Sequence, residues 1–330
     1  MQGREFDVVT GAFGYTGKYI TRRLLAMGRG VKTLTGHPER AGAFNGHIEI
    51  APLQFDRRAD LVESLRGAST LYNTYWIRFP HGEVTYEKAV ENTGVLVAAA
   101  REAGVRRIVH ISITNPSEDS TLGYFRGKAA IENLVTASGL AYAILRPTVI
   151  FGVEDVLINN IAWLLRHCPV FAIAGSGDYR LQPVFVVDVA EMAVAAGRES
   201  GNKVIDAVGP EIYAFEDLVR MVAGKVGSHA KILHVPPALA LFLARLVGRA
   251  VRDVVLTQEE IEGLMAGLLV SKNEPTGRTR LSQWASRHAH LLGRRYASEL
   301  ERHFRRKAPN TEGTEGTSGK SCGSAKLKPT

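Results

Sequence analysis

Tyr124 and Lys128 have the spacing best suited to proton-transfer chemistry. They lie four positions apart at the start of a segment with helical periodicity, residues 122–138, so the phenol and the ammonium group project from one face. A fixed cation favours the ionised form of a neighbouring phenol, so Lys128 is expected to lower the pKa of Tyr124. The pair could then move a proton to or from a substrate oxygen. In isolation, the same spacing is more typical of a surface pair.

Hydroxyl groups end the predicted strand at residues 107–113, shortly before this helix. Ser112 and Thr114 fall at the carboxyl end of that strand, where ligands bind in open α/β sheets. A hydroxyl at this place could hydrogen-bond a substrate oxygen and share its developing negative charge. Thr114 is the preferred candidate for this role, and Ser112 is the alternative.

A loop with three glycines follows an apolar run at residues 6–9 and precedes an amphipathic segment at residues 18–25. In a strand, loop and helix order, the first glycine allows a tight turn and the second lets the backbone approach a pyrophosphate. The third lets helix and sheet pack closely, and the first helical turn presents free amides to the phosphates. Glycine used for backbone freedom alone is the less favoured alternative. The residues predicted to bind the dinucleotide here are Gly11, Phe13, Gly14, Tyr15, Thr16 and Gly17.

Apolar runs and helix-period segments alternate around these residues. The runs that predict strands are residues 6–10, 31–35, 48–53, 70–73, 107–113 and 142–145. The segments that predict helices between them are residues 15–27, 59–65, 83–103 and 122–138. Such alternation is typical of a parallel sheet covered on both faces, and right-handed crossovers make it doubly wound. The fold class predicted is therefore α/β, a doubly wound parallel Rossmann sheet with a smaller, mostly helical C-terminal lobe.

The alternation of strand and helix segments becomes less regular after residue 145. This suggests that the chain is divided into two domains. Residues 1–150 are predicted to form an NAD(P)-binding Rossmann domain, with residues 181–208 completing it. Residues 151–180 and 209–306 are predicted to form the C-terminal lobe, which contains helices at residues 158–166, 214–226, 239–252 and 258–269. Asp188 is expected to cap a helix at the entry to this lobe. Residues 307–330 have almost no apolar side chains, so a disordered tail is expected.

Composition narrows the class of protein. Of 330 residues only two are cysteines, Cys168 and Cys322, too far apart to suggest a disulfide framework or a zinc site. This favours a reducing compartment, and we expect no metal site. No export signal or membrane-spanning stretch is evident, so a cytoplasmic location is expected.

The net charge of +8 is concentrated between residues 287 and 307. A solvated basic face is preferred there over a nucleic-acid or lipid site, and no nucleic-acid-binding motif accompanies it. The apolar segment at residues 239–249 is too short to span a bilayer. A helix buried in the lobe is preferred over an interfacial helix at a membrane surface.

Taken in order, these motifs resemble a known superfamily. They are Thr10-Gly11-x-x-Gly14-x-x-Gly17, Ser112-x-Thr114, Tyr124-x-x-x-Lys128, Leu145-Arg146-Pro147-Thr148-x-x-Phe151-Gly152 and Val186-Val187-Asp188-Val189-Ala190. The chain resembles the short-chain dehydrogenase/reductase superfamily from about residue 6 to residue 304. More narrowly, it is similar to the atypical and extended branch, which includes NAD-dependent epimerase/dehydratase-like proteins and relatives of the 39 kDa accessory subunit of respiratory complex I.

The resemblance implies roles for particular residues. Tyr124 would be the general acid/base, Lys128 would lower its pKa and hold the nicotinamide ribose, and Thr114 or Ser112 would polarise the substrate. The family's other cofactor contacts fall on the nicotinamide side at Pro147 and Thr148, on the adenine side at Asp56, and on the cleft wall at Asn73.

The segment after the second strand bears on the choice of cofactor. No acidic residue stands directly at the strand end, where NAD-dependent forms use one on the ribose diol. His37 and Arg40, with Arg22 or Arg23 across the loop, could instead neutralise a 2′-phosphate. NADP is therefore the expected cofactor, and NAD is the alternative.

Three functions follow from the resemblance. The first is an NADP-dependent oxidoreductase of atypical short-chain type, acting on a carbonyl or carbinol of a small molecule. The second is a non-catalytic cofactor-bound scaffold or assembly factor, whose C-terminal lobe contacts a protein partner or a membrane surface. The third is a sugar-nucleotide epimerase or dehydratase. Association of subunits through the helices at residues 83–103 and 122–138 is compatible with each.

Overall fold

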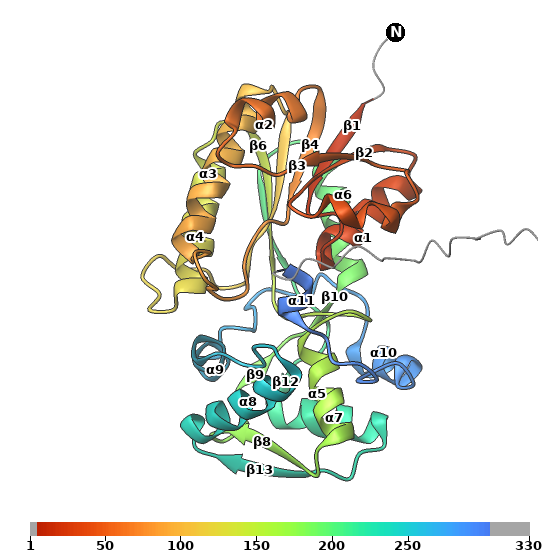
Figure 1. Ribbon diagram of the computed structural model, residues 1–330, viewed down its shortest axis with the longest axis vertical. Helices are drawn as coiled ribbons and strands as arrows, with labels where there is room; N and C mark the ends of the chain where they lie inside the picture. Colours follow the sequence, from red (N-terminus) through yellow and green to blue (C-terminus); the bar gives the residue numbers. More distant parts are fainter. Residues whose placement is uncertain (1–4, 304–330) are drawn as a thin grey trace, which may run out of the picture.

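Seven parallel strands form the central sheet in the computed structural model, which describes residues 5–303 (Figure 1). Across the sheet the order is β11-β6-β5-β4-β1-β2-β3. The chain reverses its direction of winding between β1 and β4, which makes the carboxyl ends of these two strands the switch point where ligands bind in such sheets. The strands are β1 (Phe6–Thr10), β2 (Gly30–Thr35), β3 (Glu49–Pro52), β4 (Ala68–Asn73), β5 (Arg107–Ile111), β6 (Ala141–Pro147) and β11 (Lys203–Ala207).

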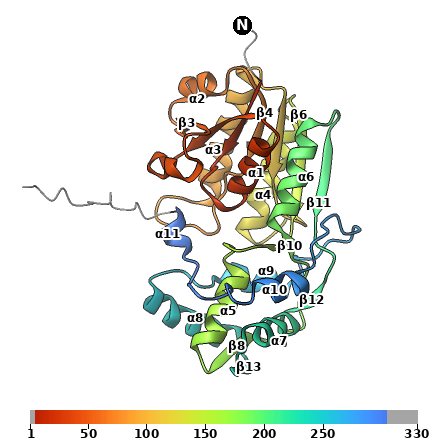
Figure 2. The same ribbon diagram turned by 90° about the vertical axis from the view of Figure 1, so that its right-hand side faces the viewer.

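Helices cover both faces of this sheet. On one face α1 (Tyr15–Ala26) lies against α6 (Val186–Arg198), and on the other face lie α2 (Arg58–Leu65), α3 (Tyr86–Glu102) and α4 (Gly123–Thr136) (Figures 1 and 2). Neighbouring side chains of β1 point to opposite faces of the sheet, because side chains alternate along a strand. They therefore pack in two different cores. Val9 packs in the core beneath α1 and α6, whereas Val8 packs in the core beneath α2 and α3. Burial on both faces explains the continuous apolar runs in the sequence.

The C-terminal lobe has a core of its own. It is built from α5 (Leu157–His167), α7 (Phe215–Val226), α8 (Pro237–Val251), α9 (Gln258–Met265), α10 (Leu281–His288) and α11 (Glu299–His303), with β8 (Val170–Ala174) and β13 (Lys231–Val235) paired in parallel. Two further short strand pairs are present: β7 (Ile150–Phe151) pairs in parallel with β10 (Val184–Phe185), and β9 (Arg180–Leu181) pairs in antiparallel with β12 (Tyr213–Ala214) within the lobe. The chain enters this lobe after β6 and returns to the sheet for α6 and β11.

The predicted fold class is confirmed, whereas three local expectations are corrected. The parallel pair of β8 and β13 was not anticipated, because β13 is short and half-exposed and so lacks the apolar run of a buried strand. Asp188 is not a helix cap: α6 begins after Phe185. The Asp188 carboxylate instead accepts hydrogen bonds from the backbone amides of Arg278 and Thr279, at 2.8 Å each. This contact ties a distant loop of the chain to the start of α6.

The third correction concerns the helix predicted at residues 239–249. The helix is present as α8, but within it only Ala240 and Gly248 are buried, so its expected burial is wrong. It lies at the periphery of the lobe (Figure 2), and Leu239, Phe242 and Leu246 on one of its sides are exposed. None of the helices between residues 5 and 303 is long and apolar enough to cross a membrane. The predicted tail at residues 307–330 lies outside the described residues.

Candidate active site

The glycine loop has the backbone geometry that a dinucleotide requires. Gly11 has a φ of +65°, in the region that side chains disfavour, and Gly14 precedes the first turn of α1. A Cβ atom on Gly17 would lie 2.3 Å from the carbonyl oxygen of Gly11, so only glycine allows α1 to sit this close to β1. Phe13, Tyr15 and Thr16 are partly buried between these glycines. The free amides of the first turn of α1 therefore fit a pyrophosphate.

Side chains at the switch point hold β1 and β4 together. The Thr10 hydroxyl oxygen accepts hydrogen bonds from the amides of Thr74 at 2.8 Å and Tyr75 at 3.1 Å. The Asn73 side-chain nitrogen lies 3.1 Å from Nδ1 of His110, and both side chains are fully buried. Burial, with the nearby Lys128, lowers the pKa of His110 well below its usual range. His110 is therefore neutral. Asn73, which was predicted to line the cofactor cleft, contacts His110 at the carboxyl end of β4.

Of the three residues expected to meet the adenosine half of the cofactor, Arg40 and His37 have protein partners. Arg40 donates hydrogen bonds to the carbonyl oxygens of Arg302 at 2.7 Å and Glu301 at 3.3 Å, both in α11. His37 lies with Nδ1 3.1 Å from a carboxylate oxygen of Glu39. Asp56 is exposed in the turn after β3. Arg40 thus links the sheet domain to the last described helix.

α11 also lies next to the glycine loop. Arg302 donates to the carbonyl oxygen of Glu154 at 2.5 Å, and its guanidinium carbon lies 5.6 Å from the centre of the Tyr15 ring. Glu154 in turn accepts from Lys18 at 2.7 Å and from Tyr19 at 3.0 Å, both in α1. α11 is therefore anchored beside the first turn of α1 through Arg302.

Tyr124 stands in the first turn of α4 inside an aromatic cluster. Its ring centre lies 5.6 Å from Trp76 and 6.0 Å from Tyr86, each in an edge-to-face arrangement. Burial raises the pKa of Tyr124, and the carboxylates of Glu260 and Glu299 raise it further. The expected lowering by Lys128 is therefore wrong: desolvation dominates in this environment.

Lys128 lies one turn later on the same face of α4 and is buried. Its Nζ donates a hydrogen bond to the carbonyl oxygen of Ile111 at 2.8 Å and lies 4.8 Å from the centre of the Trp76 ring. Burial lowers the pKa of Lys128 from 10.5 to about 7, although Glu132 opposes this shift. Lys128 is thus held against the carboxyl end of β5, close to its own point of titration at neutral pH.

The two candidate hydroxyls at the end of β5 differ in their partners. Ser112 donates to a carboxylate oxygen of Glu132 at 2.5 Å, and Glu132 also pairs with Arg146 at 2.5 Å. The buried hydroxyl of Thr114 has no hydrogen-bond partner among residues 5–303. Its amide donates to the carbonyl oxygen of Pro147 at 2.8 Å. A buried hydroxyl without a partner is unusual, so Thr114 is the better placed of the two to bind a ligand atom.

Pro147 ends β6 beside this site, Thr148 follows it, and both are buried. The Thr148 hydroxyl donates to the carbonyl oxygen of Gln182. It therefore contributes to the junction with β10 and lines the cavity described next.

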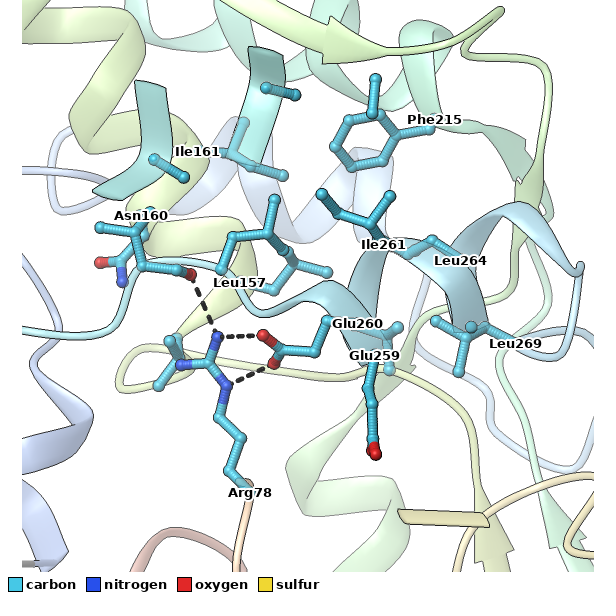
Figure 3. A pocket seen from close by; sticks show the side chains of 18 of the residues that line it. Arg78, Leu157, Asn160, Ile161, Phe215, Glu259, Glu260, Ile261, Leu264 and Leu269 are labelled. Atoms are coloured by element: carbon cyan, nitrogen blue, oxygen red, sulfur yellow. Dashed lines mark hydrogen bonds and ion pairs between the residues drawn. The ribbon is translucent and has the colours of Figure 1, made fainter. Parts of the chain in front are cut away.

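A cavity of about 610 Å³ lies between α4 and the C-terminal lobe, and Tyr124 forms part of its wall. Most of its lining is apolar and comes from α5, β8, α7, α8 and α9, as Figure 3 shows for Ile161, Phe215, Ile261 and Leu264. Its polar side chains are few and include Arg78, Asn160, Thr148, Glu259 and Glu260. The volume is in the range of small-molecule sites.

Two acidic residues of α9 organise the polar end of this cavity, and sequence reasoning missed both. Glu260 pairs with Arg78 through two hydrogen bonds, at 2.5 and 3.1 Å (Figure 3). Glu259 accepts from the amides of Gly123 and Tyr124 at 3.3 Å each, at the start of α4. The sequence Thr257-x-x-Glu260 is a capping box and could have located the helix, but nothing local indicated its partners in the other domain.

Trp76 was also missed. It follows β4 and contacts Tyr124 and Lys128, and a Cβ atom on Gly127 would lie 2.6 Å from its indole ring. The sequence signal that could have located Trp76 is its position directly after Asn73-Thr74-Tyr75, at the strand end expected to line the cofactor cleft. Among residues 5–303 no cluster of His, Cys, Asp and Glu is placed to hold a metal ion.

Comparison with known proteins agrees with this geometry. The family model described as NAD(P)H-binding matches residues 11–155. The mitochondrial NADH dehydrogenase [ubiquinone] 1 alpha subcomplex subunit 9 of Arabidopsis thaliana is 25% identical over 287 residues, covering 80% of this chain and 71% of the relative. A 4-hydroxy-2-methyl-3-oxo-4-farnesyl-3,4-dihydroquinoline-1-oxide ketoreductase of Stigmatella aurantiaca is 24% identical over 86% of this chain and 93% of its own length.

Solved structures share the fold. A nucleoside-diphosphate-sugar epimerase from Staphylococcus aureus has a TM-score of 0.70 at 18% identity, over 85% of this chain and 99% of its own. An NADPH-dependent quinone oxidoreductase from Escherichia coli, complexed with NADPH, has a TM-score of 0.69 at 21% identity, over 86% of this chain and 99% of its own.

Fold, glycine loop and family match together define an NAD(P)H-binding protein with a Rossmann domain. Within that class, the chain is homologous to the complex I subunit represented by the Arabidopsis relative.

Proposed function

We propose that the protein is an NADP-dependent oxidoreductase of atypical short-chain type that reduces a carbonyl group of an apolar small molecule. The observation that carries this proposal is the position of Tyr124. It belongs to the wall of the apolar cavity and lies one helical turn before Lys128, which is bonded to the end of β5. A substrate in the cavity would therefore meet the acid/base residue at the edge of the sheet that binds the cofactor.

The protonation state of Tyr124 favours reduction as the direction of the reaction. Because its pKa is raised by burial, the phenol stays protonated at neutral pH and is suited to donate a proton. Tyr124 would protonate the carbonyl oxygen, and the Thr114 hydroxyl would donate a hydrogen bond to the same oxygen. A bound nicotinamide supplies the hydride for the carbonyl carbon. Lys128 would hold the nicotinamide ribose, as in the family it resembles.

The lining of the cavity argues against a sugar nucleotide as substrate. A nucleoside diphosphate carries negative charge and many hydroxyl groups, which need polar partners when they are buried. The charge of Arg78 is matched by Glu260, and Glu259 adds a further carboxylate. An apolar carbonyl compound fits this cavity better. The names of the farnesylated ketone reductase and the quinone oxidoreductase are consistent with that class.

A second candidate function is a cofactor-bound protein without turnover. The packing of Lys128 favours this candidate. Its Nζ already donates a hydrogen bond to the carbonyl oxygen of Ile111 and lies over the Trp76 ring, so it is engaged within the protein. The complex I subunits among the relatives also favour it. In this case the cofactor would stabilise the fold, and the C-terminal lobe would contact a protein partner or a membrane.

Turnover of NADPH with long-chain aldehydes and prenylated quinones distinguishes the two candidates. We expect Tyr124→Phe to lower kcat/KM by about a hundredfold or more, with NADPH affinity unchanged. Tyr142→Phe, on β6 outside the cavity, is the control and should retain wild-type rates. Bound NADPH that no carbonyl compound oxidises, or full activity in Tyr124→Phe, would overturn the enzyme proposal in favour of the second candidate.

A further inference from the structure

The exposed side of α8 carries a stripe of large apolar side chains. Leu239, Phe242, Leu243 and Leu246 are 44%, 53%, 36% and 44% exposed. Their spacing, i, i+3, i+4 and i+7, places all four on one face of the helix. The opposite face, with Ala240 buried, packs on the lobe. A solvent-facing stripe of this kind is characteristic of a surface that meets an apolar partner.

Basic side chains lie along one edge of this stripe. Arg245 and Arg249 are exposed and four residues apart on α8. At about 100° per residue, both fall on the same flank of the apolar stripe. α8 carries no acidic residue. Apolar side chains flanked by arginines are the arrangement of a helix lying in the interface of an anionic lipid bilayer.

The stripe continues into the cavity. Leu243 and Leu246 are exposed at the surface and also line the cavity, and Ala244 and Val247 of the same helix complete this part of its lining. The mouth of the cavity therefore opens beside the apolar face of α8. Both views place α8 in the C-terminal lobe, the part of the molecule remote from the N-terminus, and Figure 2 shows it at the periphery of this lobe (Figures 1 and 2).

We propose that α8 docks on an anionic lipid surface and that the cavity takes up a membrane-soluble molecule through the mouth beside Leu243 and Leu246. The positive charge of the arginines favours an anionic lipid surface over an uncharged partner. Because the apolar stripe is continuous with the cavity lining, docking would bring the cavity mouth to the lipid. A hydrocarbon chain could pass from the bilayer into the lobe without entering water. The uptake step rests on the proposed function, because it makes this cavity the substrate site, whereas the docking step does not.

Vesicle flotation of the full chain tests the docking step. The protein should float with vesicles of phosphatidylcholine containing phosphatidylglycerol and bind at least fivefold less to phosphatidylcholine alone. Phe242→Ser and Leu239→Ser avoid the residues that line the cavity, and each should lower the partition coefficient about tenfold. Arg245→Glu with Arg249→Glu should abolish the preference for anionic vesicles.

Matched substitutions elsewhere on the surface serve as controls. Leu291→Ser removes a leucine that is 46% exposed outside α8, and Arg287→Glu reverses an exposed charge on α10. Both should float like the wild type. No flotation of the wild type, or equal loss in the control variants, would overturn the docking step. A dimer in solution that Phe242→Ser dissociates would overturn it too, because the stripe would then be a contact between copies of the chain.

Fluorescence of diphenylhexatriene, measured without vesicles, tests uptake separately. The wild type should bind this neutral hydrocarbon, and Ala244→Trp and Ala172→Phe, both filling the cavity, should lower its affinity tenfold or more at unchanged Tm. Phe242→Ser should bind it like the wild type. Affinity unchanged in both filled variants would overturn the uptake step. Tyr124→Phe should keep probe binding and flotation, so loss of turnover in that variant tests only the proposed reaction.

Discussion

Glu259 of the C-terminal lobe accepts a hydrogen bond from the backbone amide of Tyr124 at 3.3 Å. The same carboxylate accepts from the amide of Gly123 at 3.3 Å. A carboxylate at this place compensates free amides and the positive end of the helix dipole. The position of Tyr124 over the cavity therefore depends on a residue far away in the sequence and in the other domain.

Replacing that carboxylate tests the contact directly. Glu259→Ala should lower the free energy of unfolding by about 1 kcal/mol. It should also speed amide hydrogen exchange at Gly123 and Tyr124. Glu262→Ala, on the exposed side of the same helix, is the control. If exchange at the start of α4 were the same in both variants, Glu259 would not hold this helix end.

Lys128 makes stability depend on pH in a defined direction. Its pKa is lowered from 10.5 to about 7 in the folded protein by burial. Between pH 7 and pH 10 the unfolded chain binds a proton at this side chain that the folded protein does not hold. The free energy of unfolding should therefore rise with pH in this window, by at most about 1.4 kcal/mol per pH unit.

Urea unfolding at pH 7 and pH 9 measures this effect. Lys128→Met removes the titrating group, so its stability should change less with pH than that of the wild type. Lys225→Met, at an exposed position on α7, should retain the wild-type dependence. Identical pH dependence in all three proteins would show that Lys128 does not titrate in this range.

Gly17 is predicted to be irreplaceable in the glycine loop. Because its Cβ atom would lie 2.3 Å from the backbone oxygen of Gly11, Gly17→Ala should destabilise the protein by about 1–3 kcal/mol. It should also lower NADPH affinity. Gly224→Ala is a matched control, since Gly224 is also helical and has open space around it.

The control should leave NADPH binding unchanged. It should also stabilise the protein by up to about 1 kcal/mol, because alanine is the better helix former. Calorimetric titration with NADPH and thermal unfolding check both variants. Wild-type affinity in Gly17→Ala would contradict the assignment of this loop to the pyrophosphate.

Arg40 connects cofactor choice with the C-terminal segment. It was predicted to bind a 2′-phosphate, and the structure gives it the carbonyl oxygens of Glu301 and Arg302 as partners. Arg40→Ala should therefore speed proteolytic cleavage of the C-terminal segment. If it also serves the phosphate, as proposed, NADPH affinity should fall about tenfold and NADH affinity should change little.

Arg57→Ala, at an exposed position outside this contact, is the control. Equal losses of affinity for NADPH and NADH in Arg40→Ala would assign Arg40 to the anchoring of α11 alone. Retention of wild-type protease resistance would contradict that anchoring.

The parallel sheet and the glycine loop could be predicted from the sequence alone. Both depend on short-range rules: the alternation of apolar and helical periods, and glycine spacing between a strand and a helix. The shared helix face of Tyr124 and Lys128 could also be predicted, because residues four positions apart lie on the same side of a helix.

Tertiary structure decided the chemistry that these residues can perform. The pKa of Tyr124 is raised because the ring is buried near Glu260 and Glu299, residues of the other domain. The sequence offers both Ser112 and Thr114 as hydroxyls at this strand end, and the structure shows that the Ser112 hydroxyl donates a hydrogen bond to Glu132. The sequence of α8 predicts a core helix, but in the part of the chain that the structure describes its Leu239, Phe242 and Leu246 side chains are exposed. Burial and long-range partners are set by how the domains meet, and no local pattern of residues encodes that arrangement.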